Sequence, residues 1–241
     1  MTQTRSLPVW ILSGVPLVVL WRAVSLFWPS SHIDIPEMLR IPNLLLGMFF
    51  LCAGVITFNR APSRWSLVFV VYCLGSGIHW GGSIGVTPEL ELPLLFFYMA
   101  CTLLSAGGFL HLALIYPHGN VAHGWRIALY MPALAAALVS PFVGLLPDDR
   151  VRQLLGTELI IGSIMSWAGA LYLLWRLITA DGTLRRESGL ALIVGAVFLA
   201  GTLQQLGSMG ILPGEPAAWN LILFLIPLAI AVALMSREPA E

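Results

Sequence analysis

Three polar side chains interrupt apolar stretches of the sequence that are long enough to be membrane helices. His79 lies near the end of the apolar run 66–85, and Gln204 and Gln205 lie together in the run 190–211. Imidazole and amide groups in hydrocarbon usually face the interior of a helix bundle and often mark a functional path. Both runs are expected to cross the membrane in the same direction, which puts the three side chains at a similar depth. We therefore expect them to line one outward-facing cavity that binds a small or lipidic ligand.

Three further polar residues are expected at comparable heights. Arg22 lies near the end of the first apolar run, Glu158 opens the sixth and Asn220 opens the eighth. Each could join the same cavity and contact its ligand. Each could equally lie in the headgroup region, because interfacial charged and amide side chains reach water easily. The sequence leaves both interpretations open.

Histidine and cysteine spacing speaks against a metal or haem site. His79 and His111 are expected at opposite membrane faces, and no predicted helix carries two histidines four residues apart, a spacing used to bind one metal ion. The cysteines form no Cys-x-x-Cys pair and fall inside apolar runs, so we expect three small buried side chains: Cys52, Cys73 and Cys101. No metal and no cofactor is predicted.

Catalytic signatures are weak. The sequence contains no Gly-x-Ser-x-Gly elbow and no His-Glu-x-x-His motif. Ser83 near His79 is the only pairing of a nucleophile with a base that we consider, and Asp148-Asp149 is typical of a hydrated turn. All twelve basic residues are arginines, which excludes Schiff-base chemistry on a lysine. No catalytic residue is predicted.

A row of glycines indicates close helix packing. Gly77, Gly81 and Gly85 recur every four residues, so they share one face of the predicted third helix. Without side chains there, a neighbouring helix can approach closely. That neighbour could belong to the same chain or to a second copy in a homodimer.

The elements that position these residues are membrane spans. A span needs about 20 apolar residues, and the sequence predicts an all-α helical bundle of about eight spans in one transmembrane domain, 1–241. The predicted spans are 7–28, 42–58, 66–85, 92–116, 127–146, 157–178, 190–211 and 219–235.

Composition agrees with a lipid-facing chain. Hydrophobic residues make up 58% of the sequence and charged residues only 10%, far below the roughly 25% of soluble domains. Membrane lipid is thus the expected partner. The net charge of zero gives no argument for binding nucleic acid.

The arginines predict that both termini lie in the cytoplasm. With that orientation most arginines fall on the inner side, as the positive-inside rule requires. The inner set is Arg5, Arg60, Arg64, Arg126, Arg176, Arg185, Arg186 and Arg237, and the outer set is Arg40, Arg150 and Arg152.

The end of the fourth predicted span carries a family resemblance. The segment from His111 to Pro117, His-Leu-Ala-Leu-Ile-Tyr-Pro, resembles the His-x-x-Leu-x-aromatic-Pro ending found in the membrane sensor regions of bacterial histidine kinases, including competence-type quorum-sensing kinases. Tyr116 stands where many members have Phe, and the residues printed after the last predicted span, 236–241, are too few to hold a kinase core. Ending the helix at Pro117 is an equally good structural explanation of the motif.

Three function classes remain open. The resemblance implies a non-enzymatic sensor or signalling module in the bacterial cytoplasmic membrane, working with a partner membrane or kinase subunit. The second class is an accessory subunit of a larger membrane complex or a carrier of small solutes. The third class is an intramembrane enzyme.

Overall fold

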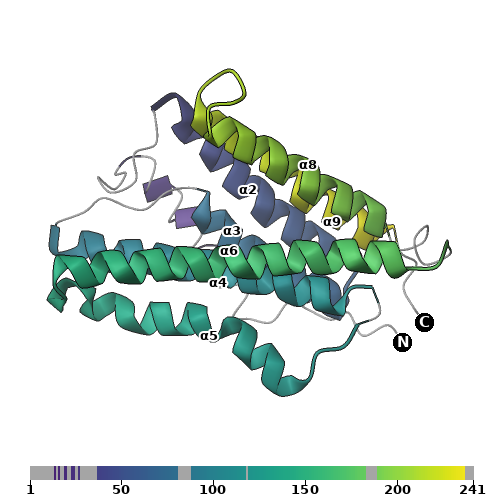
Figure 1. The fold of residues 1–241 in the computed structure, drawn as a ribbon, viewed down its shortest axis with the longest axis horizontal. Helices are drawn as coiled ribbons and strands as arrows, with labels where there is room; N and C mark the ends of the chain where they lie inside the picture. The colour runs from purple at the N-terminus through teal and green to yellow at the C-terminus, as the bar shows by residue number, and fades with distance from the viewer. Residues whose placement is uncertain are drawn as a thin grey trace.

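The computed structural model describes residues 37–80, 88–117, 119–182 and 189–236, with isolated helical residues between 14 and 27. The described part is all helical (Figure 1). Its α-helices are α2 (Glu37–Arg60), α3 (Arg64–His79), α4 (Pro88–Ile115), α5 (His123–Val139), α6 (Asp148–Thr179), α8 (Leu190–Ser208) and α9 (Leu225–Met235). Two 3-10 helices extend them, η1 (Ser140–Leu145) after α5 and η2 (Pro216–Phe224) before α9.

Six helical stretches of the described residues are long and apolar enough to cross a membrane. The chain is therefore an all-helical, multi-pass membrane protein. The six stretches are Arg40–Arg60, Glu91–Ile115, His123–Leu145, Asp148–Thr179, Leu190–Ser208 and Ala218–Met235. Two of them combine an α-helix with a 3-10 helix, η1 in one and η2 in the other.

The prediction of about eight spans is wrong for the described residues. The predicted span 66–85 corresponds to α3, which has 16 residues and a length of about 24 Å, short of the roughly 30 Å hydrocarbon core. Gly81 and Gly82 follow α3 in the sequence, and glycine after a helix is a stop signal that a hydropathy argument overlooks. The predicted span 7–28 lies mostly outside the described residues.

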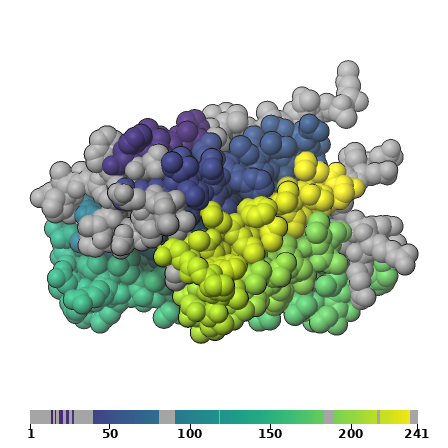
Figure 2. All heavy atoms as spheres, turned by 90° about the horizontal axis from the view of Figure 1, so that it is seen from above, coloured from purple at the N-terminus to yellow at the C-terminus, as the bar shows by residue number. Residues whose placement is uncertain are grey.

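The helix α4 is the centre of the bundle. It packs against α3, α5 and α6, while α2 covers the other side of α3. The C-terminal helices α8 and α9 pack on each other, and α9 also contacts α2, as the view from above shows (Figure 2). The chain thus forms a packed group, α2 to α6, with a C-terminal pair leaning on one side of it.

Glycines bring α3 and α4 into backbone contact. A Cβ atom added at Gly75 of α3 would lie 2.6 Å from the backbone nitrogen of Ser105 in α4. A Cβ atom at Gly108 of α4 would lie 2.9 Å from the backbone nitrogen of Tyr72 in α3. Neither position leaves room for a side chain. This close contact differs from the predicted glycine face, of which Gly77 is buried and Gly81 and Gly85 lie outside the described residues.

Hydrogen bonds fasten α3 to the end of α4. A capping box between Ser63 and Ser66 starts α3. Beside it, Arg64 donates to the carbonyl oxygen of Gly119 at 2.8 Å, and the indole nitrogen of Trp65 donates to the carbonyl oxygen of Ile115 at 3.2 Å. The start of α3 therefore lies at the end of α4, as an antiparallel pair requires.

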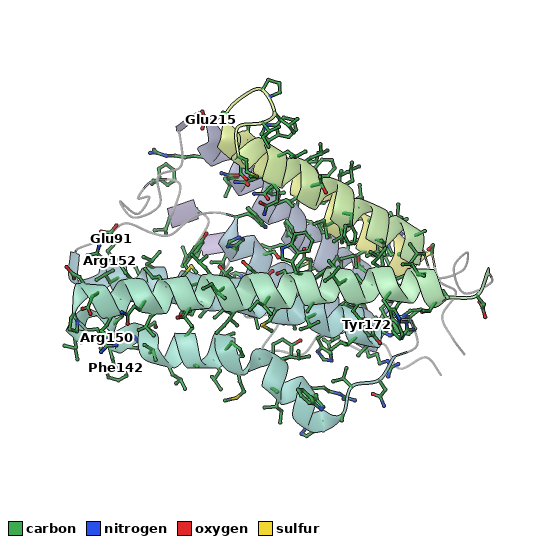
Figure 3. The ribbon with its side chains drawn as sticks, viewed as in Figure 1. Glu91, Phe142, Arg150, Arg152, Tyr172 and Glu215 are labelled. Atoms are coloured by element: carbon green, nitrogen blue, oxygen red, sulfur yellow. The ribbon has the colours of Figure 1, made fainter. Side chains whose placement is uncertain are left out.

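The two ends of the bundle differ in their charged residues. Glu91, Arg150 and Arg152 gather at one end, and Tyr172 lies near the other (Figure 3). The N-terminus of α6 there also carries Asp148 and Asp149, so this end holds acidic residues together with two arginines, and we call it the acidic end. The opposite, arginine-rich end holds Arg60, Arg64, Arg126 and Arg176. Cytoplasmic placement of the arginine-rich end stays a prediction.

Candidate functional site

A cavity of about 380 Å³ lies between the packed group and the C-terminal helices. We call it the polar cavity. Its wall comes from α3, α4, α6 and α8, with single residues from η2 and α9. His79, Gln204 and Gln205 all line it, so the structure brings these three predicted site residues together. Their role in binding a ligand stays a prediction.

His79 is held firmly at the last turn of α3. Its Nδ1 atom lies 2.9 Å from the hydroxyl oxygen of Thr102, and the hydroxyl of Tyr98 donates to the His79 carbonyl oxygen at 2.9 Å. The imidazole ring packs edge-on against Trp80, with 4.4 Å between ring centroids. The same Thr102 hydroxyl lies 3.2 Å from the carbonyl oxygen of Tyr98, so it bonds both to the imidazole and to the backbone of α4. The orientation of the imidazole is fixed before any ligand arrives.

The two glutamines differ in their surroundings. Gln204 is half-buried and donates from Nε2 to the side-chain oxygen of Asn220 at 3.1 Å. Asn220, on η2, therefore supports the site through Gln204, although it is not itself among the lining residues. Gln205 is exposed, and its side chain makes no hydrogen bond to any described residue. One amide is positioned by the protein, and the other is available to a ligand.

Most of the polar wall was missed by sequence reasoning. Four helices each place two polar residues, three positions apart, on the cavity side: Ser76 and His79, Thr102 and Ser105, Ser163 and Ser166, and Thr202 and Gln205. Residues three apart share one face of a helix. That repeated spacing inside apolar runs is visible in the sequence and would have predicted the cavity wall.

Ser76 of α3 and Ser105 of α4 form a hydrogen bond between these two helices. Their hydroxyl oxygens lie 2.6 Å apart, and Ser76 is almost fully buried. Ser76 directly follows Gly75, where the backbone of α3 meets the backbone of α4 at Ser105. Part of the wall of the polar cavity is thus the hydrogen-bonded, closely packed seam between α3 and α4.

Two predicted members that the structure describes, Asn220 and Glu158, do not line the polar cavity. Arg22 lies outside the described residues. Glu158 is buried on α6 and is not a lining residue, although its neighbour Leu159 is. The Oε2 atom of Glu158 has no hydrogen-bond partner among the described residues. Its position is therefore inside the helix packing and not at the hydrated surface.

The polar cavity exists because α6 and α8 diverge. Ala170 and Leu173 of α6 share one buried cluster with Leu190, Ile193 and Val194 of α8. From there α8 leans away from α6 toward the acidic end (Figure 1). The helices touch near the arginine-rich end and leave the polar cavity between them farther along.

The residues of the sensor-like motif have packing roles. His111 is buried, and its Nδ1 atom lies 2.9 Å from the hydroxyl of Tyr130 on α5. Tyr116 is 1% exposed and packs edge-on against Trp65 of α3. The motif therefore ties the end of α4 to two neighbouring helices.

The cysteines and the possible metal ligands can be compared with the predictions from the sequence. Cys73 and Cys101 are buried as predicted, but Cys52 is exposed on α2, because hydropathy does not distinguish a lipid-facing position from an internal one. The described residues contain no group of three or more histidine, cysteine or acidic side chains placed to hold a metal ion.

Comparison of the chain with protein-family models, curated proteins and solved structures found no match.

Proposed function

We propose that the protein is a non-enzymatic membrane receptor that binds a small amphipathic ligand in the polar cavity. The observation that carries this proposal is the meeting of His79, Gln204 and Gln205 around one cavity of about 380 Å³. Pockets for small ligands are typically about 300–1,000 Å³, with a few polar groups on an otherwise apolar wall. The polar cavity has that size and that composition.

The wall selects for a molecule with one polar and one apolar part. Imidazole, amide and hydroxyl groups offer both hydrogen-bond donors and acceptors, and no charged side chain is among the lining residues. Phe109, Phe198 and Ile226 supply apolar surface. An uncharged polar head with a short apolar tail satisfies both sets of groups.

The geometry favours binding over catalysis. A hydroxyl nucleophile needs a base that accepts its proton. The Thr102 hydroxyl lies 2.9 Å from Nδ1 of His79, but it is also bonded to the Tyr98 carbonyl oxygen at 3.2 Å, which competes for its proton. Thr102 is thus held by the backbone of its own helix, which favours a structural role over that of an activated nucleophile.

The contact pattern supplies a means of signalling. Because the buried cluster shared by α6 and α8 lies near the arginine-rich end, a ligand held in the polar cavity would bias the angle at which α8 and α9 lean on the packed group. A ligand shifts such an equilibrium when it binds one arrangement more tightly. The C-terminal helix would pass that change to a partner, such as a kinase subunit in the bacterial cytoplasmic membrane. The resemblance of the α4 end to kinase sensor regions supports this reading.

The proposal is tested by filling the polar cavity. Gly201 lines it, while Gly195 lies on the exposed side of the same helix, and an added Cβ atom meets no atom within 4 Å at either position. Gly201→Phe should therefore occupy the polar cavity, and Gly195→Phe is its matched control. Small molecules that copurify from the host membrane are identified by mass spectrometry.

A ligand should be retained by the wild type and by Gly195→Phe and be lost from Gly201→Phe. Equal retention by both variants would contradict the proposal. Movement of the identified ligand across vesicles containing the purified protein would show a carrier instead of a receptor.

A further inference from the structure

A second cavity, of about 720 Å³, lies between α4 and α5. We call it the α4–α5 groove. Alanines leave the space between the two helices: Ala100 of α4, and Ala133 and Ala137 of α5, are lining residues. Larger apolar side chains that are exposed, including Phe97 and Met131, line it as well. Along most of its length the groove is an apolar channel on the lipid-facing side of the bundle.

One end of the α4–α5 groove is positively charged. His123 and Arg126, from the first turn of α5, and Tyr130 line it there. The guanidinium of Arg126 is positioned by two local bonds: Nε donates to the Val121 carbonyl oxygen at 2.7 Å, and Nη2 donates to the Asn120 side-chain oxygen at 3.0 Å. Arg126 is exposed and has no acidic partner among the described residues. The groove therefore joins an apolar channel to an uncompensated cation.

We propose that the α4–α5 groove binds an anionic phospholipid of the surrounding membrane. Its phosphate would contact Arg126, and one acyl chain would lie along the alanines and the apolar walls. A guanidinium recognises phosphate oxygens through charge-assisted hydrogen bonds. Basic sites between membrane helices at the cytoplasmic side are suited to lipid headgroups. This site is separate from the polar cavity and does not depend on the proposed receptor function.

The charge at the groove's end argues for a lipid over a second copy of the chain. Two copies packed through α5 about a twofold axis along the membrane normal would place both Arg126 side chains at the same depth, facing each other. Like charges at such a contact are unfavourable. A phospholipid supplies the opposite charge and the apolar surface together.

The test uses the purified protein in nanodiscs of phosphatidylcholine, with phosphatidylglycerol added as the anionic probe. Native mass spectrometry measures how much phosphatidylglycerol stays bound. Arg126→Gln removes the charge in the groove, and Arg60→Gln removes an exposed charge at the same end outside it. Arg126→Gln should reduce the retention of phosphatidylglycerol about tenfold, because that is the effect expected from losing one charge-assisted hydrogen bond. Arg60→Gln should change it little.

A second pair of variants tests the acyl-chain part of the groove. Ala137→Phe should fill it and release phosphatidylglycerol and phosphatidylcholine alike, while Ala135→Phe, on an exposed position outside the groove, should not. Unchanged phosphatidylglycerol retention in Arg126→Gln would overturn the proposal. So would efficient disulfide cross-linking of two copies through Met131→Cys, because a second copy would then occupy the groove.

Discussion

The α3–α4 contact and the α6–α8 contact both join antiparallel, apolar helices, yet they are built in opposite ways. Along α3 and α4, the backbones touch at Gly75 and Gly108, and hydroxyl groups bond across the seam. Along α6 and α8, apolar side chains meet near one end and a cavity opens toward the other. In a membrane, apolar surface alone does not hold helices together, so small residues and polar bonds decide where they close.

The largest expected effect is at the close contact. Gly75→Leu should destabilise the protein by about 3 kcal/mol, because even its Cβ atom would lie 2.6 Å from the Ser105 backbone nitrogen and 2.7 Å from the Cys101 carbonyl oxygen. Backbone atoms in two helices cannot move aside as a flexible side chain can. The measurement is the unfolding midpoint in detergent, followed by size-exclusion chromatography.

Gly195→Leu, on α8, is the control for Gly75→Leu. Its position on α8 is exposed, and an added Cβ atom meets no atom within 4 Å. Replacing a helical glycine there should leave stability unchanged or raise it by up to about 1 kcal/mol. Equal losses at Gly75 and Gly195 would mean that the α3–α4 seam is no tighter than the rest of the bundle.

The next effect concerns the hydroxyl pair in the seam. A double-mutant cycle with Ser76→Ala and Ser105→Ala should give a coupling free energy of about 1–2 kcal/mol, at the upper end for bonds between membrane helices. The bond measures 2.6 Å, and Ser76 is almost fully buried. A coupling near zero would show that the glycines alone hold the seam.

The all-helical membrane fold could be predicted from composition and run length, because lipid requires apolar spans with internally bonded backbones. The number of spans could not be predicted in the same way. The third run is apolar for 20 residues in the predicted interval 66–85, but α3 ends at His79, ahead of Gly81-Gly82. Hydropathy measures transfer into lipid, whereas helix length also depends on stop signals and on burial among other helices.

Part of the candidate site could be predicted, because residues at the same depth in neighbouring helices can lie close together. His79 and the two glutamines were placed at matching heights from the 1.5 Å rise per residue, and they line one cavity. Glu158 also has a comparable height, but it faces the helix packing and not the cavity. The rotation of a helix about its axis is set by packing against its neighbours, and a single apolar sequence carries little information about it.

A smaller effect is expected where the C-terminal helices support the polar cavity. Gln204→Ala combined with Asn220→Ala in a double-mutant cycle should give a coupling of about 0.6 kcal/mol, the average for such bonds in membranes. The bond is longer than the serine pair and lies at a half-buried position. A coupling that exceeds the Ser76–Ser105 value would reverse the comparison between the two regions.

The smallest expected effect on stability is at Gln205, and it separates binding from folding. Gln205 is exposed on the cavity wall and makes no side-chain hydrogen bond to a described residue, so Gln205→Ala should change the unfolding free energy by less than about 0.5 kcal/mol. If its amide serves a ligand, the same substitution should weaken retention of the copurified molecule by about three- to tenfold, the loss of one neutral hydrogen bond. Thr157→Ala, an exposed polar position on α6 outside the polar cavity, controls for the loss of a polar group. Unchanged ligand retention in Gln205→Ala would remove this amide from the binding site, while His79 and Gln204 would still be open to the same measurement.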